Sequence, residues 1–186
     1  MFVNFLLGMI ALCGCISNAS GIQRVYYSNT RILSKEINTI IIHNNYGDIC
    51  VQSSPSNATL VSFNCSSDDI DICETNGILT IRNKQKSCFR FFNPQIINFY
   101  IYFPSSVRNM DINLRRGKVT VETQAPTLTI SGGYLDILLK DMKGDMRISG
   151  GKCNVRYIGE IKTLNENVSF DISSGHLTLD ALRNDF

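Results

Sequence analysis

The segment TLTISGGYLDI at residues 127–137 is followed along the chain by DMRISGGKCNV at residues 145–155. Each segment has two alternating apolar positions, a Ser-Gly-Gly turn, and two more alternating apolar positions. Alternation with a period of two directs one face of a β-strand inward. The two segments therefore predict a repeated unit in which two short strands meet at a glycine corner.

Two further copies flank this pair, MDINLRRGKVTV at residues 110–121 and SFDISSGHLTL at residues 169–179. One glycine from each copy can be aligned, and the spacing widens toward the C-terminus, as expected where loops lengthen on one side. The aligned glycines are Gly117, Gly133, Gly151 and Gly175. Glycine permits positive φ at a sharp corner. Fainter copies begin at Gly47 and Gly77, which are also predicted turn glycines.

A single unit of this kind cannot bury its apolar face, whereas stacked units cover one another. We therefore predict an all-β fold of the short-coil β-solenoid type, similar to a parallel β-helix, as one domain over residues 37–186. Hairpin turns also use glycine, so an antiparallel β-sandwich is the alternative. The alignment places Cys153 at an inward position, where we expect a buried thiol that packs as a small apolar group.

The N-terminus carries the apolar run FLLGMIALCG at residues 5–14, which contains no charge. This length is typical of a signal peptide and is shorter than a transmembrane helix. We predict a signal peptide at residues 1–19 that is cleaved after Ala19. An alternative is a lipoprotein signal that ends at Cys15, which would then be lipidated. Residues 20–36 are predicted to be a linker or an irregular start.

Composition and residue spacing argue against several kinds of site. The net charge of +2 is too small to indicate a nucleic-acid partner. No cysteine spacing resembles a zinc site, so neither a metal nor a cofactor is expected. His43 and His176 stand alone in the sequence and are expected at surface turns. The acidic residues near position 70 lack the spacing of a calcium loop. Cys65 and Cys73 are close enough in sequence to be a candidate disulfide.

Several of these segments together resemble a bacterial family of putative adhesin domains. The matching pieces are Gly47-Asp48-Ile49, the strand-proline segment at residues 101–104, and Ser-Gly turns such as Ser131-Gly132. Members of this family resemble exported or membrane-tethered β-solenoids of otherwise unknown function. The resemblance brings no catalytic residue with it. Arg115-Arg116 departs from the family pattern, which favours small or acidic residues at this place.

These observations favour a non-enzymatic, exported binding module, either secreted or in the cell envelope, at the periplasmic or outer surface. The expected partner is a protein or a glycan at a cell surface. Contact with a membrane is expected only through a lipid anchor on Cys15. One alternative is a lipid-tethered structural scaffold of the envelope. A second alternative is a polysaccharide-active enzyme, because a pair of catalytic carboxylates is defined by spatial separation and cannot be excluded from sequence.

Overall fold

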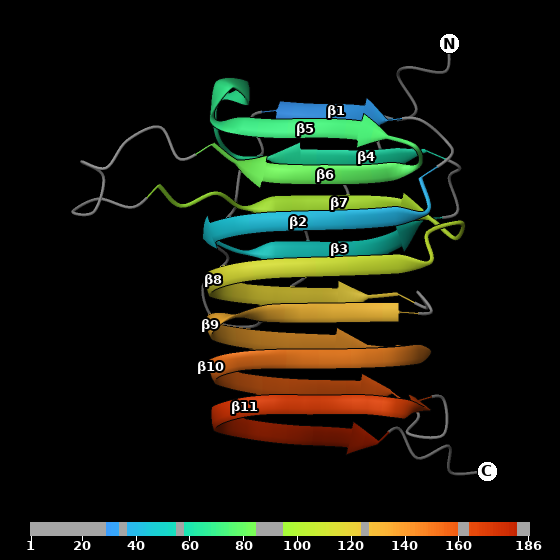
Figure 1. Cartoon of the computed structure of the whole chain (residues 1–186), viewed down its shortest axis with the longest axis vertical. Helices are drawn as coiled ribbons and strands as arrows, with labels where there is room; N and C mark the ends of the chain where they lie inside the picture. Colours follow the sequence, from blue (N-terminus) through green and yellow to red (C-terminus); the bar gives the residue numbers. More distant parts are fainter. Residues whose placement is uncertain are drawn as a thin grey trace, which may run out of the picture.

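The computed structural model of the chain describes residues 29–33, 37–54, 58–84, 95–123, 127–159 and 164–181. The predicted signal peptide, its cleavage site and Cys15 lie outside these residues. The all-β prediction is confirmed, because the described residues form one eleven-stranded sheet with a single 3-10 turn at Ser67–Asp69 (Figure 1). Within these residues, no helix has the length and apolar character needed to cross a membrane.

Eleven strands are described, numbered in chain order. They are β1 (Asn29–Leu33), β2 (Thr39–Tyr46), β3 (Ile49–Ser54), β4 (Thr59–Phe63), β5 (Ile70–Thr75), β6 (Ile78–Asn83), β7 (Phe99–Pro104), β8 (Asn109–Glu122), β9 (Thr127–Lys140), β10 (Gly144–Gly159) and β11 (Leu164–Ala181). β1 lies within the range assigned above to a linker or irregular start. It pairs with β4 instead, at the edge of the sheet.

Strand β8 joins the two layers of the sheet. Its first half pairs with β2 and its second half pairs with β3, both in parallel. Beyond β2 the sheet continues through β6 and β5, and beyond β3 it continues through β7, β4 and β1. Two layers of strands therefore face each other across the core and are connected at the bends of the long strands (Figure 1).

The four repeated segments lie in β8, β9, β10 and β11, which pair in parallel with one another. The register can be followed through one inward position. Ile112 lies opposite Ile130, Ile130 opposite Ile148, and Ile148 opposite Phe170. The spacing along the chain is equal for the first two pairs and wider for the third. Antiparallel pairs also occur in the sheet, between β1 and β4, β4 and β7, and β5 and β6.

The glycine-by-glycine alignment drawn from the sequence is wrong at both ends of the repeat. Gly117 lies opposite Leu135, and Gly175 lies opposite Cys153. Gly117 and Gly175 have φ values of +151° and +147°, which strongly favour glycine. Gly133 and Gly151 are not among the glycines with positive φ. They lie two positions earlier in the bend, where a Cβ atom would lie 2.7 Å from the nearest backbone oxygen at Gly133 and 3.0 Å from it at Gly151.

Gly77 has a different role from the one predicted. It is the second residue of a two-residue turn, after Asn76, which joins the antiparallel strands β5 and β6. Both turn residues have positive φ, at 52° for Asn76 and 75° for Gly77. An Asn-Gly pair is the preferred sequence for a hairpin turn of this type. Gly77 therefore closes a hairpin and is not a corner of the repeat.

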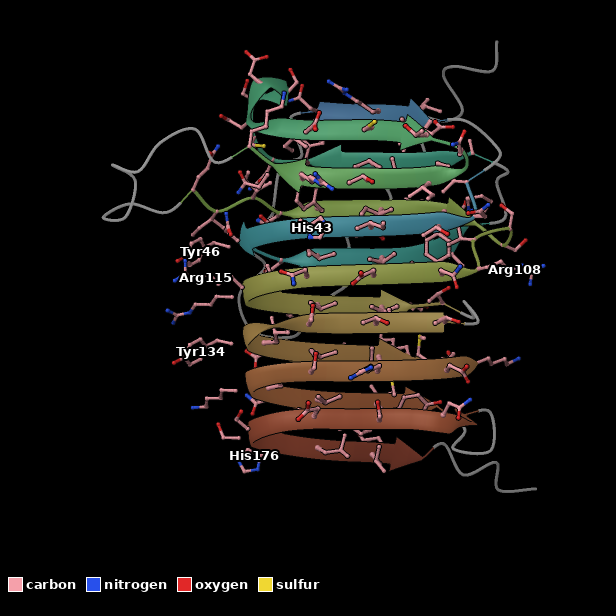
Figure 2. The ribbon with its side chains drawn as sticks, viewed as in Figure 1. His43, Tyr46, Arg108, Arg115, Tyr134 and His176 are labelled. Carbon is pink, nitrogen blue, oxygen red and sulfur yellow. The ribbon has the colours of Figure 1, made fainter. Side chains whose placement is uncertain are left out.

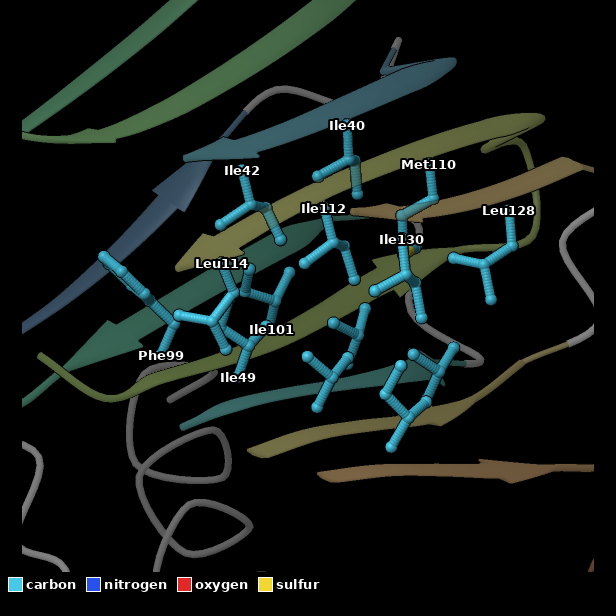
Figure 3. Packing of buried hydrophobic residues seen from close by; sticks show 14 of the residues in the cluster. Ile40, Ile42, Ile49, Phe99, Ile101, Met110, Ile112, Leu114, Leu128 and Ile130 are labelled. Atoms are coloured by element: carbon cyan, nitrogen blue, oxygen red, sulfur yellow. The ribbon is translucent and has the colours of Figure 1, made fainter. Parts of the chain in front are cut away.

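The core is a set of apolar ladders between the two layers (Figure 3). Ile42, Ile112, Ile130 and Ile148 are fully buried and lie in register on successive strands. Cys153 is also fully buried, as expected from the sequence. The ladders end at β11, which pairs only with β10 among the described strands. Residues predicted to face inward on β11 are consequently more open, with Leu177 47% exposed.

Candidate functional site

The bends of the long strands carry a row of tyrosine and basic side chains, all of them exposed except Tyr46, which is half-buried. Tyr46, at the end of β2, lies opposite Arg116 on β8, and Arg116 lies opposite Tyr134 on β9. Tyr134 in turn lies opposite Lys152 on β10. Together with Arg115, these residues are called the corner ridge below. Figure 2 shows Tyr46, Arg115 and Tyr134 along one side of the molecule, with Arg108 on the opposite side.

Close backbone packing at the bend explains why these side chains project outward. A Cβ atom on Gly117 would lie 1.8 Å from the carbonyl oxygen of Gly47. At Gly132 it would lie 1.9 Å from the carbonyl oxygen of Leu114. The neighbouring strand's backbone thus leaves no room for a side chain at these glycines, whereas the large residues beside them, Arg116 and Tyr134, are exposed to solvent.

Hydrogen bonds fix the connection between β2 and β3, from which Tyr46 projects. The amide of Gly47 donates to the carbonyl of Arg116 at 3.2 Å. The Asp48 carboxylate accepts from the amide of Lys118 at 3.1 Å. The side-chain amide of Asn44, which is buried, donates to the carbonyl of Ile97 at 2.8 Å. These bonds hold Tyr46 against β8 as part of the sheet rather than of a separate loop.

Arginine and tyrosine side chains contact each other along the corner ridge. The Arg115 guanidinium carbon lies 5.7 Å from the centre of the Tyr46 ring, and that of Arg116 lies 5.9 Å from the centre of the Tyr134 ring. Such separations are within the range of cation–π attraction. Tyr134 nevertheless remains 63% exposed, so its ring is available to a ligand.

The electrostatic balance of the bend is positive. Four basic side chains lie there, namely those of Arg115, Arg116, Lys118 and Lys152, and all four are exposed. Two carboxylates follow the bend, those of Asp48 and Asp136, which leaves two positive charges by subtraction. Both carboxylates already accept a hydrogen bond, from the Lys118 amide and from the side chain of Asn154. The bend is therefore suited to an anionic partner.

A second polar cluster lies on the layer that contains β3 and β7. The Tyr100 hydroxyl donates to the side-chain oxygen of Gln52, and it is also hydrogen-bonded to the Tyr102 hydroxyl at 2.8 Å. Gln52 donates to the Glu122 carboxylate at 3.1 Å, and Lys140 lies 3.9 Å from the same carboxylate. The side chains of this cluster bind one another and are only partly exposed. It is a less accessible surface than the corner ridge.

The other residues considered as catalytic or metal ligands are not brought together. His43 lies within β2, opposite Arg82 and Asn113, rather than at the end of a strand. His176 is on β11, with β8, β9 and β10 between it and β2. Asp68 and Asp69 form part of the 3-10 turn. Within the part of the chain that the structure describes, no three His, Cys, Asp or Glu residues are arranged to hold a metal ion.

The two cysteines considered as a disulfide pair differ in exposure, with Cys65 half-buried and Cys73 exposed. Cys50, Cys65, Cys73 and Cys153 are thiols in the structure, so Cys65 and Cys73 are not joined. Cys65 packs against the core. Cys73 is exposed on β5, where Ile70 and Ile72 take the inward positions. Burial raises the pKa of the Cys65 thiol to about 11, and the neighbouring Asp69 carboxylate adds to this rise.

We expect Cys73 to be alkylated much faster than Cys65. A pKa raised from 9.0 to about 11 lowers the Cys65 thiolate fraction about 100-fold near pH 8. The rate at Cys65 should rise steadily as the pH approaches 11. Timed reaction with iodoacetamide, followed by mass spectrometry of the peptides, measures each site separately. Equal rates in the folded protein, or a peptide in which Cys65 and Cys73 are disulfide-linked, would contradict this arrangement, and denatured protein is the control.

Comparison with known proteins supports the fold and gives no family assignment. No protein-family model matches the sequence, and no curated protein sequence matches it. A solved structure described as a putative cell adhesion protein, from Clostridium sporogenes, is similar with a TM-score of 0.55 and 10% identity. The match covers 82% of this chain and 97% of that chain.

Two solved structures from other bacteria match with lower scores. One, from Bacteroides fragilis, is described as a putative adhesin, with a TM-score of 0.31 and 13% identity, covering 83% of this chain and 96% of that one. The other, from Parabacteroides distasonis, is described as a putative lipid binding protein, with a TM-score of 0.35, 13% identity and the same coverage. The likeness to the Clostridium sporogenes structure shows that the two chains share a fold.

Proposed function

We propose that this chain is an exported, non-catalytic, adhesin-like module that binds a carbohydrate polymer on the corner ridge. The observation that carries the proposal is the in-register row of Tyr46, Arg116, Tyr134 and Lys152. A tyrosine offers a flat apolar face and a polar hydroxyl, and arginine and lysine offer several hydrogen-bond donors. Sugar rings have the complementary character, with apolar C–H faces and polar edges.

The scaffold in this proposal is a short-coil β-solenoid. Its support is the parallel pairing of β8 to β11. The number of residues along the chain between paired positions is constant from β8 to β10 and larger from β10 to β11. In such a scaffold, equivalent positions of successive coils repeat at the strand spacing of about 4.8 Å. A straight row of this kind matches a linear polymer better than a compact small molecule.

Export is the part of the proposal that rests on the sequence. The apolar run at residues 5–14 and the small residues that precede the expected cleavage after Ala19 support it. The protein would then act in the cell envelope or be secreted. A role outside the cytoplasm agrees with the description of the Clostridium sporogenes protein of similar fold.

The test is retention on immobilised polysaccharides. The full chain, expressed with its own leader, is passed over neutral and charged polysaccharides, and release of reducing ends is measured in parallel. We expect retention on at least one polysaccharide without release of reducing ends. Tyr134→Ala should weaken retention about tenfold. Ile32→Ala is the matched control, because Ile32 is 61% exposed and Tyr134 is 63% exposed.

Three results would overturn parts of the proposal. Absence of retention on every polysaccharide would remove carbohydrate binding. Release of reducing ends would favour a polysaccharide-active enzyme instead. Equal weakening by Tyr134→Ala and Ile32→Ala would show that the corner ridge is not the binding surface.

A further inference from the structure

We infer that the corner ridge selects anionic polysaccharides, whose sugar units carry carboxylate or sulfate groups. This inference rests on the proposed function and deepens it. Its first support is the charge of the bend, which carries four exposed basic side chains and two carboxylates. Both carboxylates, those of Asp48 and Asp136, are already hydrogen-bonded within the protein. The basic side chains therefore remain available for an external anion.

The second support is the way in which the rings hold the arginines. Arg115 lies over the Tyr46 ring and Arg116 over the Tyr134 ring. A guanidinium that stacks on a ring contacts the ring with its flat face. The N–H donors at the edge of the guanidinium stay available. Those donors match the paired oxygens of a carboxylate or sulfate group. Because the rings restrict the arginine side chains, less conformational entropy is lost when an anion binds.

The third support is the repeat of the row along the strand-stacking direction. Tyr46, Arg116, Tyr134 and Lys152 lie on four neighbouring strands. At the usual strand spacing, the row is about 14 Å long. The row alternates an aromatic ring with a cation. A polymer that alternates a ring face with a charged group can contact all four residues, whereas a single small anion contacts one cation.

Two arginine double variants test the charge of Arg115 and Arg116 and their planar donors separately. The double variant Arg115→Ala/Arg116→Ala should weaken binding to heparin or polygalacturonate by about tenfold or more. Raising the salt concentration from about 0.05 M to about 0.3 M should also weaken wild-type binding, because exposed charge pairs are screened. Arg115→Lys/Arg116→Lys keeps the charge, loses the planar donors, and should have an intermediate affinity.

A matched control removes two basic residues from the other side of the molecule. Arg108 and Lys143 are exposed and precede β8 and β10 at the side opposite the bends. Arg108→Ala/Lys143→Ala gives the same net charge as the arginine double variant. It should bind heparin and polygalacturonate within about twofold of the wild type. Circular dichroism and thermal unfolding confirm that each variant is folded before binding is measured.

Calorimetric titration with heparin, polygalacturonate, neutral dextran and single-stranded DNA tests the inference. We expect binding to the two anionic polysaccharides and weaker binding to dextran and DNA. Equal binding to dextran, unaffected by the arginine variants, would overturn anionic selection and leave the proposed function standing. Tighter binding to DNA, or equal losses in the two double variants, would also overturn it. Binding to none of the polysaccharides would remove the proposed function itself.

Discussion

Replacing Gly117 with alanine is expected to destabilise the fold by on the order of 3–4 kcal/mol. The φ of +151° at Gly117 strongly favours glycine. An added Cβ would lie 1.8 Å from the carbonyl oxygen of Gly47. The strand β8 cannot move away without breaking its pairing with β2 and β3. A loss of this size approaches the whole stability of many domains.

Gly151→Ala is the matched control for this substitution. Gly151 lies in a bend of the same stack, but an added Cβ would lie 3.0 Å from the nearest atom, the carbonyl oxygen of Gly133. We expect a change of about 1 kcal/mol or less. Chemical denaturation of both variants measures the difference. If the two variants unfold at the same denaturant concentration, the packing of the bend described above is incorrect.

Replacing Ile112 with aspartate is expected to prevent stable folding. Ile112 is fully buried at the centre of a ladder, between Ile42 and Ile130. An aspartate at this position would place a carboxyl group among apolar side chains without a partner. The expected cost is about 3–5 kcal/mol or more, whether the group is charged or takes up a proton. Soluble yield, circular dichroism and thermal unfolding measure the effect.

The neighbouring substitution Asn113→Asp tests the same introduced residue on the opposite face. Asn113 is exposed, and its side chain donates to the Ser131 hydroxyl at 3.0 Å. An aspartate there can accept a hydrogen bond from that hydroxyl. The change in stability should stay within about 0.5 kcal/mol. Similar losses at the two positions would contradict the inward direction of Ile112.

The strand content and the inward positions of the repeat could be predicted from the sequence. Ile112, Ile130 and Ile148 alternate with polar residues, and each is buried. The period of a strand is local, so one segment is enough to reveal its apolar face. The parallel pairing of β8 to β11 also agrees with the stacking expected for repeated units.

The register of the repeat could not be predicted from the glycines. Two kinds of glycine occur in the bend, one with positive φ, as at Gly117, and one without, as at Gly133, and the neighbouring backbone approaches both closely. In the sequence both are a glycine between two strands, which is why an alignment by glycine pairs Gly117 with Gly133. The structure places Arg115 beside Gly133 instead, since a Cβ on Gly133 would lie 2.7 Å from the Arg115 carbonyl oxygen. The signal in the sequence that the alignment by glycine has the wrong register is Arg115-Arg116, which departs from the family pattern at this place.

The corner ridge could not be recognised before the register was known. Tyr46, Arg116 and Tyr134 are far apart in the sequence, and nothing local links them. Their proximity depends on the parallel pairing of β2 with β8, across strands β3 to β7 in the sequence. The exposure of residues at the ends of the stack also depends on contacts between distant parts of the sequence. Leu177 has the inward pattern of its equivalents but is 47% exposed, because β11 has one described neighbour.

The most direct test of the central claim is a residue-resolved titration by ¹H–¹⁵N NMR, with a heparin oligosaccharide as the ligand. The account predicts that the largest shift changes fall at Tyr46, Arg115, Arg116, Tyr134 and Lys152, with little change at Tyr100, Tyr102 and Glu122. Largest changes at the Tyr100 cluster, or no changes at a concentration that saturates retention, would contradict the corner ridge as the ligand-binding surface.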